Sequence, residues 1–436
     1  MNKSASVNEP NLELFPSAAA TDKDYTSTFA KNMNLPVHRW FRFTAGFSAL
    51  WVRDLLNEQK CRQNILDPFV GSGTVQIESK FLGQNSLGIE AQPFLHRIAK
   101  IKLNDQVDSK VINSVGKEVL QRAQDEAYPL DEYPPIIQKC YPDETLTNLN
   151  SLRKAYLEVK DQYPDEVVDY IWLVITAILR ESSPVGTAQW QYVLPNKKSS
   201  QKYADPLMAY NAKLQQIVHD LRIVNQRISH EEINTNAYHS DARNMKEVHD
   251  DWADLVITSP PYANNYDYAD ATRLELSFWG EIHSWGDLQD TIRKYLLRAC
   301  TQHVSKLKEQ EEELLHSIYL KPIKKEFTQV FNELKAKRET QGGKKNYHLM
   351  ALAYFYDLAQ VFFELRRVCK NDAKVCFVIG DSAPYGIYLP VDRWLGELAL
   401  HAEFSSYSFE KLRDRNVKWK NRKHRIPLQE GRLWIQ

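Results

Sequence analysis

Short apolar segments and helical periodicity divide this chain into strands and helices. Apolar runs of strand length predict strands at residues 64–69, 86–90, 236–239, 254–258 and 373–380. Apolar positions at helical spacing predict helices at residues 75–82, 94–103, 166–181, 206–228 and 349–369. Because strands and helices alternate from the first strand onward, the pattern predicts an α/β fold with a doubly wound, mostly parallel sheet.

Two long blocks interrupt the sheet pattern and are predicted to be largely helical insertions. They are residues 105–235 and the strongly charged residues 281–348. The parts assigned to the sheet domain are residues 25–104, 236–280 and 349–436, with a polar, flexible arm at residues 1–24. Of the 436 residues 43% are hydrophobic, which is enough for a sizeable core.

Charge is unevenly distributed along the chain. Lys+Arg and Asp+Glu both number 56, so the formal net charge is zero, which argues against a generally basic nucleic-acid coat. Residues 105–169 nevertheless hold 14 Asp/Glu against 7 Lys/Arg, and residues 411–432 hold 9 Lys/Arg against 2 Asp/Glu. The overall neutrality is therefore a cancellation between an acidic block and a basic C-terminal tail.

The five cysteines are scattered and form no CxxC pair, so neither a zinc ribbon nor a disulfide framework is indicated, and no metal is expected. No signal peptide is apparent at the start of the sequence. The longest apolar stretch, residues 170–179, is about half of what a bilayer requires. We therefore expect a soluble, cytoplasmic protein without a membrane partner.

A glycine loop, Asp67-Pro-Phe-Val-Gly-Ser-Gly-Thr74, follows the first predicted strand. Gly71 and Gly73 let the backbone approach a ligand without a Cβ, and the free N–H groups of the following helix can hold an anionic group. The loop lacks the Gly-Lys-Ser/Thr of a P-loop and the third glycine of the dinucleotide fingerprint. Glu90 ends the next strand, where a carboxylate can accept hydrogen bonds from ribose hydroxyls. An ordinary tight turn and a solvated glutamate are the alternatives.

A second loop, Ser259-Pro-Pro-Tyr262, follows the predicted strand at 254–258. Pro260 and Pro261 fix two φ angles, which makes a rigid strand-end loop with carbonyl acceptors beside a tyrosine. Such a site suits the exocyclic amine of a base that has been flipped out of a duplex and is stacked on the ring. The alternative, a plain Pro-rich turn, becomes weak once the loop is considered together with the glycine loop.

Together, the two loops resemble those of the S-adenosylmethionine-dependent DNA amino-methyltransferases, which methylate N4 of cytosine or N6 of adenine. The resemblance covers about residues 37–103, 236–280 and 349–410 and implies a class I methyltransferase-like fold. Ser-Pro-Pro-Tyr is more typical of cytosine-N4 enzymes, and Asp/Asn-Pro-Pro-Tyr of adenine-N6 enzymes. The motif order resembles the class with target recognition between the two loops, which makes residues 105–235 the candidate recognition region.

The resemblance implies cofactor contacts for S-adenosyl-L-methionine. The residues expected to bind it are Asp67, Phe69, Gly71, Gly73, Thr74, Glu90 and Asp241. Glu90 would bind the ribose hydroxyls and Asp241 would reach the adenine amine, and residues 42–47 resemble the extra cofactor motif of the family.

The resemblance also implies direct methyl transfer without a covalent intermediate. Ser259, Pro260, Pro261 and Tyr262 would form the catalytic motif. Tyr266 and Tyr268 are expected either to line the base pocket or to pack on the following helix. The turn Gly380-Asp381-Ser382 either touches the substrate or only ends its strand.

The basic tail is predicted to contact DNA phosphates, because cations interleaved with an aromatic residue are typical of such strips. The residues expected to do so are Lys418, Lys420, Arg422, Lys423 and Arg425. A smaller cluster, Lys197, Lys198 and Lys202, is expected to be merely solvated.

The leading hypothesis is a site-specific cytosine-N4 methyltransferase of double-stranded DNA in restriction-modification or host defence, with a cognate restriction or defence protein as a further partner. An adenine-N6 enzyme is the nearest alternative. RNA guanine methyltransferases usually show Asp-Pro-Pro-Tyr-Gly, whereas Ser259 and Ala263 occupy the first and last places here. A non-catalytic DNA-binding module is the remaining alternative.

Overall fold

The computed structural model describes residues 29–59, 61–185, 202–227, 233–304, 307–415 and 427–436. The arm predicted at residues 1–24 lies outside the described residues. The lysines and arginines predicted to contact DNA at 418–425 also lie outside them.

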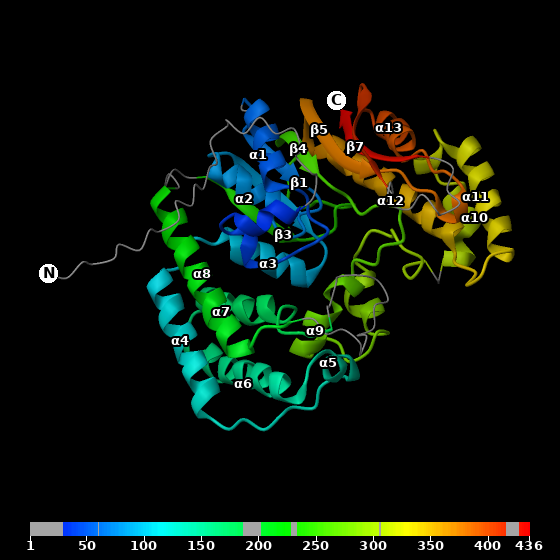
Figure 1. Ribbon diagram of the computed structural model, residues 1–436. Helices are drawn as coiled ribbons and strands as arrows, with labels where there is room; N and C mark the ends of the chain where they lie inside the picture. The colour runs from blue at the N-terminus through cyan, green and yellow to red at the C-terminus, as the bar shows by residue number, and fades with distance from the viewer. Residues whose placement is uncertain (1–28, 60, 186–201, 228–232, 305–306, 416–426) are drawn as a thin grey trace.

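Seven strands of the described residues form one sheet in the order β3-β2-β1-β4-β5-β7-β6 (Figure 1). The strands are β1 (Asn64–Asp67), β2 (Asn85–Glu90), β3 (Thr235–His239), β4 (Ala253–Thr258), β5 (Cys369–Gly380), β6 (Tyr407–Arg415) and β7 (Leu428–Ile435). Neighbours from β3 to β5 run parallel, whereas β7 is antiparallel to both β5 and β6. The predicted doubly wound, mostly parallel α/β fold is confirmed, and it is class I methyltransferase-like.

Helices cover both faces of the sheet because both faces of the central strands are apolar. α1 (Ala49–Glu58) and α2 (Thr74–Phe81) pack on one face, and α3 (Pro93–Leu103) extends this layer beside β3. α12 (Tyr347–Val368) and α13 (Val391–His401) pack on the opposite face. The strand order reverses at β1, and the C-terminal ends of strands at such a switch point are where doubly wound sheets bind ligands.

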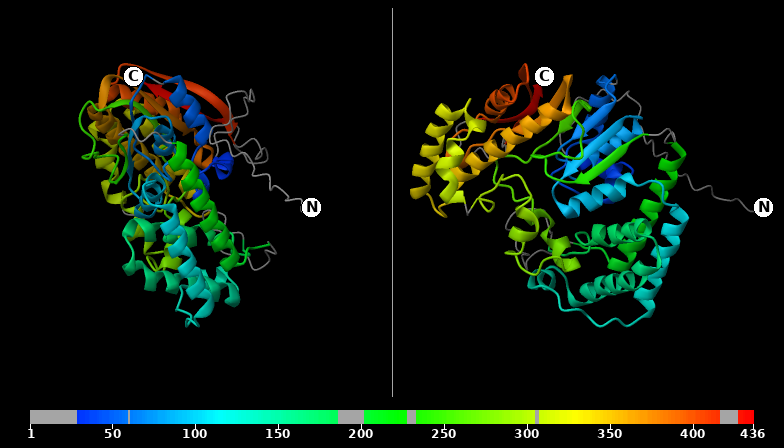
Figure 2. Two further views of the ribbon diagram at one scale, coloured as in Figure 1. Left: turned by 90° about the vertical axis from the view of Figure 1, so that its left-hand side faces the viewer. Right: turned by 180° about the vertical axis from the view of Figure 1, so that it is seen from behind.

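The first insertion forms a helical lobe beside the sheet, as Figures 1 and 2 show. Its helices are α4 (Ser109–Asp125), α5 (Pro135–Cys140), α6 (Asp143–Val159), α7 (Asp165–Ile178) and α8 (Pro206–Arg227). Their apolar faces share one core. Asp220 of α8 is fully buried and accepts hydrogen bonds from Arg39 Nε (3.0 Å) and Trp40 Nε1 (2.9 Å), which fastens the lobe to the N-terminal segment.

The second insertion is less regular than the first. It follows α9 (Arg273–Trp279) and contains a π-helical turn at Gln289–Arg293, α10 (Glu311–Leu315) and α11 (Lys324–Glu339). α11 packs on α12, at the far end of the molecule from the helical lobe (Figure 1). Between the π-helical turn and residue 304, the described chain runs in turns.

The predicted strands and helices agree with the observed elements to within a few residues, except at the C-terminal end. There the sequence suggested only a basic tail, whereas its two flanks form β6 and β7. The apolar stretch at 170–179 is buried within the helical lobe. In the part of the chain that the structure describes, no helix combines the length and hydrophobicity needed to span a membrane.

Candidate active site at the strand ends

The glycine loop makes a tight turn between β1 and α2. Gly71 and Gly73 have φ values of +56° and +88°, in the left-handed region that residues with a Cβ rarely adopt. A Cβ on Gly71 would lie 3.0 Å from Cε1 of Phe43. Both glycines are therefore required for this backbone, which leads directly into the N-terminus of α2.

The side chain of Glu90, at the end of β2, lies against the glycine loop and binds its backbone. Its Oε2 accepts a hydrogen bond from the Gly71 N–H at 2.7 Å, and its Oε1 accepts one from the Gln92 N–H at 2.8 Å. Burial raises the pKa of Glu90 to about 7 despite these two donors. The carboxylate is thus fixed by backbone groups, and each oxygen keeps a further lone pair for a ligand hydroxyl.

The Asp67 carboxylate connects the glycine loop to the end of β4 through hydrogen bonds. Its Oδ1 accepts hydrogen bonds from Thr258 Oγ1, the last residue of β4, at 2.6 Å and from the Phe69 N–H at 2.9 Å. The side chain is buried, which raises its pKa to about 7. Asp67 therefore holds the glycine loop in register with the loop that carries Ser259.

Asp241 lies in the loop after β3, where the family resemblance expects a contact to the cofactor's adenine. Its carboxylate is 42% exposed and pairs with Arg243 at 2.7 Å. Arg243 in turn lies 3.2 Å from Asp357, which is fully buried in α12. The position of Asp241 is therefore fixed through an ion-pair chain to the opposite layer of helices.

A cavity lies between these residues, at the C-terminal ends of the strands where the strand order reverses. Of the predicted cofactor residues, Phe69, Gly71, Thr74, Glu90 and Asp241 line it. Asp67 and Gly73 do not line the cavity; they stabilise the conformation of the glycine loop. The predicted extra motif also contributes, through Phe43, Ala45, Gly46 and Phe47.

The cavity suits S-adenosylmethionine chemically. Two glycines leave the backbone open, a buried carboxylate stands at the end of β2, and apolar walls are present on both sides. Gln92, a fully buried lining residue, has an Oε1 without a hydrogen-bond partner, which is available to a polar group of a ligand.

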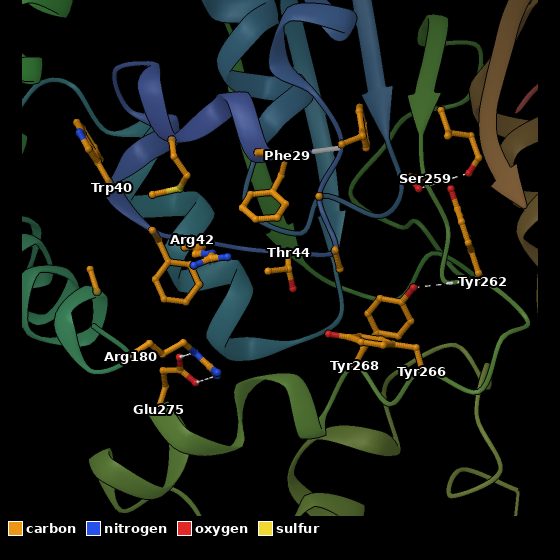
Figure 3. Close-up of a pocket in the computed structure, with 18 of the residues that line it drawn as sticks. Phe29, Trp40, Arg42, Thr44, Arg180, Ser259, Tyr262, Tyr266, Tyr268 and Glu275 are labelled. Atoms are coloured by element: carbon orange, nitrogen blue, oxygen red, sulfur yellow. Dashed lines mark hydrogen bonds and ion pairs between the residues drawn. The ribbon is translucent and has the colours of Figure 1, made fainter. Parts of the chain in front are cut away.

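The Ser-Pro-Pro-Tyr loop leaves the sheet directly beside this cavity. Ser259 Oγ donates to the Val378 carbonyl of β5 at 3.4 Å, and the Tyr262 N–H donates to Tyr268 Oη at 3.3 Å (Figure 3). Pro260 is buried, and Pro261 lines the cavity beside the glycine loop. Burial also raises the pKa of the Tyr262 phenol above its usual range, so the ring stays neutral.

A second, larger cleft of about 950 Å³ opens on the other side of Ser259. Ser259 and Tyr268 line both the cleft and the smaller cavity beside the glycine loop, so the two spaces meet at the Ser-Pro-Pro-Tyr loop. Tyr262 and Tyr266 line the cleft, and the Tyr266 and Tyr268 rings pack edge to face with centroids 4.7 Å apart. The two later tyrosines thus both line the cleft and pack on one another.

Three distant segments complete the cleft, and sequence reasoning missed them. Arg180, in the helical lobe just after α7, forms a two-point ion pair with Glu275 of α9, at 2.6 and 2.7 Å (Figure 3). Lys213 of α8 lines the same wall. Arg415 and Glu430 of the C-terminal hairpin line the wall beside Tyr262. No local motif signals these residues, because only the tertiary fold brings them together.

The second insertion forms hydrogen bonds with the segment that follows the Ser-Pro-Pro-Tyr loop. Arg293 donates to the Asp267 carboxylate at 2.7 and 3.0 Å, and Thr301 donates to Asn265 Oδ1 at 2.9 Å. Tyr295, in the same segment, lines the smaller cavity beside the glycine loop.

A buried group of potential metal ligands lies beside these hydrogen bonds. Ligand atoms of Asp267, Cys300 and His303 lie within 4.8 Å of one another. Arg293 already neutralises Asp267, however, and a guanidinium at 2.7 Å disfavours a cation at the same carboxylate. We therefore interpret the group as part of the packing behind the catalytic loop.

The predicted phosphate strip lies outside the described residues, but its flanks are placed. Arg415 ends β6 and Leu428 begins β7, and these two residues pair in the hairpin next to the cleft. Lys202 of the smaller basic cluster is exposed, while Lys197 and Lys198 lie outside the described residues.

The described chain combines a class I methyltransferase-like sheet with a glycine loop after β1 and Ser-Pro-Pro-Tyr after β4. The chain is 28% identical to the type II methyltransferase M.BsoBI of Geobacillus stearothermophilus, over 89% of this chain and 82% of that protein. It is 25% identical to the type II methyltransferase M.AvaI of Anabaena variabilis, over 87% and 81%.

A shorter match of 28% identity links 25% of the chain to the type II methyltransferase M.MjaII of Methanocaldococcus jannaschii. No protein-family model and no solved structure matches the chain. The near full-length similarity to type II methyltransferases supports a DNA methyltransferase of a restriction-modification system.

Proposed function

We propose that this protein transfers the methyl group of S-adenosylmethionine to the exocyclic N4 amine of cytosine in double-stranded DNA. The observation that carries the proposal is the place of Ser259, which lines both the cofactor cavity and the large cleft. A methyl donor in the first space and a base in the second would meet at this residue. The serine in Ser-Pro-Pro-Tyr favours cytosine over adenine.

The residues of the loop orient the target amine. The Ser259 hydroxyl proton points to the Val378 carbonyl, so the oxygen lone pairs are available to accept a hydrogen bond from the amine. The Pro260 carbonyl accepts the second amine proton, and Tyr262 stacks on the extruded base. When bound, the cofactor supplies an activated methyl group, and the chain contributes positioning and electrostatic stabilisation.

The cofactor would be held by Glu90 at its ribose, by the Gly71 region at its methionine part and by Asp241 near its adenine. The N-terminal segment would close the cavity through Phe43, which already packs against Gly71. These are the residues whose alteration should affect cofactor binding rather than DNA binding.

The base specificity is directly testable. DNA from cells that express the protein should contain N4-methylcytosine and no additional N6-methyladenine when its nucleosides are separated by mass spectrometry. A catalytically dead Ser259→Ala, Tyr262→Ala double variant is the matched control. Detection of N6-methyladenine alone would favour the adenine alternative, and methylation confined to RNA would favour the RNA alternative. Sequencing with modification detection would give the recognition site.

The basic strip predicts a strong salt dependence of DNA binding. Each phosphate contact contributes about 0.9 to the slope of log K against log salt, because bound counterions are released. We therefore replace Lys418, Lys420, Arg422, Lys423 and Arg425 by glutamine. The slope should become less steep by about 0.9 for each phosphate contact that is lost. The matched control replaces Lys197, Lys198 and Lys202 and should leave the slope close to that of the wild type. An unchanged slope in the first variant would show that the strip does not contact phosphates.

A further inference from the structure

The C-terminal hairpin places an arginine against the tyrosine of the catalytic loop. Cζ of Arg415, the last residue of β6, lies 5.1 Å from the centroid of the Tyr262 ring. This is within the range of a cation–π contact. The Arg415 side chain is 17% exposed, so water screens the attraction only weakly.

Two further contacts fix the Arg415 guanidinium independently of the ring. Its Nη1 donates a hydrogen bond to the Asp381 carbonyl at 2.8 Å, and its Nε lies 3.8 Å from Glu430 Oε2. Glu430 is buried and accepts hydrogen bonds from Arg413 at 3.0 and 3.1 Å. Arg415 is therefore held by the end of β5 and by β7, and it can restrain the tyrosine rather than merely follow it.

The turn after β5 is shaped around this arginine. A Cβ at Gly380 would overlap the Arg415 guanidinium, so only glycine leaves room for it to cross the strand end. Two residues later, Ser382 Oγ donates to the carbonyl of Ala263, the residue after Tyr262. The turn at 380–382 thus contacts both Arg415 and the catalytic loop.

We propose that Arg415 is a positioning residue for methyl transfer, which holds the Tyr262 ring in the orientation that stacks on the extruded base. The inference rests on the proposed role of the Ser259–Tyr262 loop. Because Arg415 acts through Tyr262, its loss should slow the step after DNA binding and leave DNA affinity intact. An arginine that contacted a phosphate instead would change the affinity and its salt dependence.

The hairpin offers a matched control for this residue. Arg432 of β7 is 18% exposed, lies over the Trp51 ring at 5.3 Å and is 3.6 Å from Glu410. It is not among the residues that line the cleft or the cofactor cavity. Arg415 and Arg432 therefore share burial, an aromatic partner and a carboxylate, and they differ in their distance from the catalytic loop.

The test compares Arg415→Met, Arg415→Lys and Arg432→Met in the full-length protein, on DNA that the wild type methylates. Arg415→Met should lower kcat by about 10- to 100-fold, because misplacement of a positioning group by about 1 Å has effects of this size. Its Kd for DNA and the salt slope should match those of the wild type. Arg415→Lys should recover part of the rate, since a cation remains, and Arg432→Met should retain the wild-type rate.

Gly380→Ala provides a second, independent variant, because it displaces the guanidinium without removing it. It should also lower kcat at unchanged DNA affinity, and thermal unfolding of each variant will show that it is folded. A wild-type kcat for Arg415→Met, or a loss that appears in Kd, would overturn the inference. A wild-type protein that methylates no DNA would overturn the proposed function itself and, with it, this role of Arg415.

Discussion

Replacing Ser259 by alanine should lower the rate of methyl transfer to DNA by about 100- to 1000-fold, as is typical when a preorganised hydrogen-bonding group is removed from a reacting centre. The hydroxyl donates to the Val378 carbonyl at the meeting point of the two cavities, where we propose that its oxygen accepts a hydrogen bond from the target amine. Single-turnover incorporation of a labelled methyl group would measure the effect. Cofactor affinity should stay close to that of the wild type, because Ser259 lines the cavity only where it meets the cleft and the hydrogen bond between Glu90 and Gly71 is unchanged.

Tyr262→Ala tests the other half of the same loop. Loss of the stacking ring should cost about 10- to 100-fold, since base–aromatic stacking contributes about 1–3 kcal/mol per base. Tyr262→Phe keeps the ring and should retain most of the rate, while Tyr203→Ala, which alters an exposed tyrosine, serves as a control. If Ser259→Ala and Tyr262→Ala both methylate DNA at the wild-type rate, the catalytic assignment is wrong.

Glu90→Gln should weaken the binding of S-adenosylmethionine by about 10- to 100-fold, because hydrogen bonds to a charged group contribute about 1.5–3 kcal/mol. Isothermal titration of the cofactor would measure the loss. The wild-type affinity should rise as the pH increases through about 7, since the ribose hydroxyls require the ionised carboxylate and burial raises its pKa to this value. Glu90→Gln should reduce this pH dependence, and the exposed Glu247→Gln should not change it.

The raised pKa of Glu90 also makes the stability of the cofactor-free protein depend on pH. This stability should fall as the pH rises, whereas the cofactor affinity should increase. Between pH 4.5 and about 7 the folded state holds a proton on Glu90 that the unfolded chain has released. The free energy of unfolding should therefore fall as the pH rises through this window. Asp67, whose pKa is also raised to about 7, contributes with the same sign and should remain in Glu90→Gln. Denaturant titrations at several pH values would measure this change. A free energy of unfolding that rises through this window would contradict the raised pKa values of Glu90 and Asp67.

The sequence predicted the two loops because their chemistry is local. Gly71 and Gly73 have backbone conformations that only glycine adopts readily. The two consecutive prolines after Ser259 can be identified directly from the sequence. The structure places the two loops side by side because β1 and β4 are parallel neighbours, whose C-terminal ends meet at one edge of the sheet.

The walls of the cleft could not be predicted in this way. Arg415 faces Tyr262 only because β6 pairs with β7 in a particular register and β7 inserts beside β5. Five of the nine residues of β6 are charged and none of the nine is buried, so the sequence of this strand shows no clear apolar alternation. Likewise, Arg180 meets Glu275 across 95 residues, through the docking of the lobe on α9. Contacts of this kind depend on register and helix packing, which a single sequence does not encode locally.

The order of the strands also constrains how the protein is made. β1 pairs with β4 across about 190 residues, and the intervening helical lobe shares its core with α3 and the N-terminal segment. During synthesis the lobe can pack on these earlier segments before β4 is made, whereas β1 gains its second neighbour only when β4 follows. β6 pairs only with β7 among the described strands, so it has no neighbour until residues 428–435 have left the ribosome. Arg415 therefore reaches Tyr262 only after β7 has paired with β5, and the positioning role proposed for it becomes available only then.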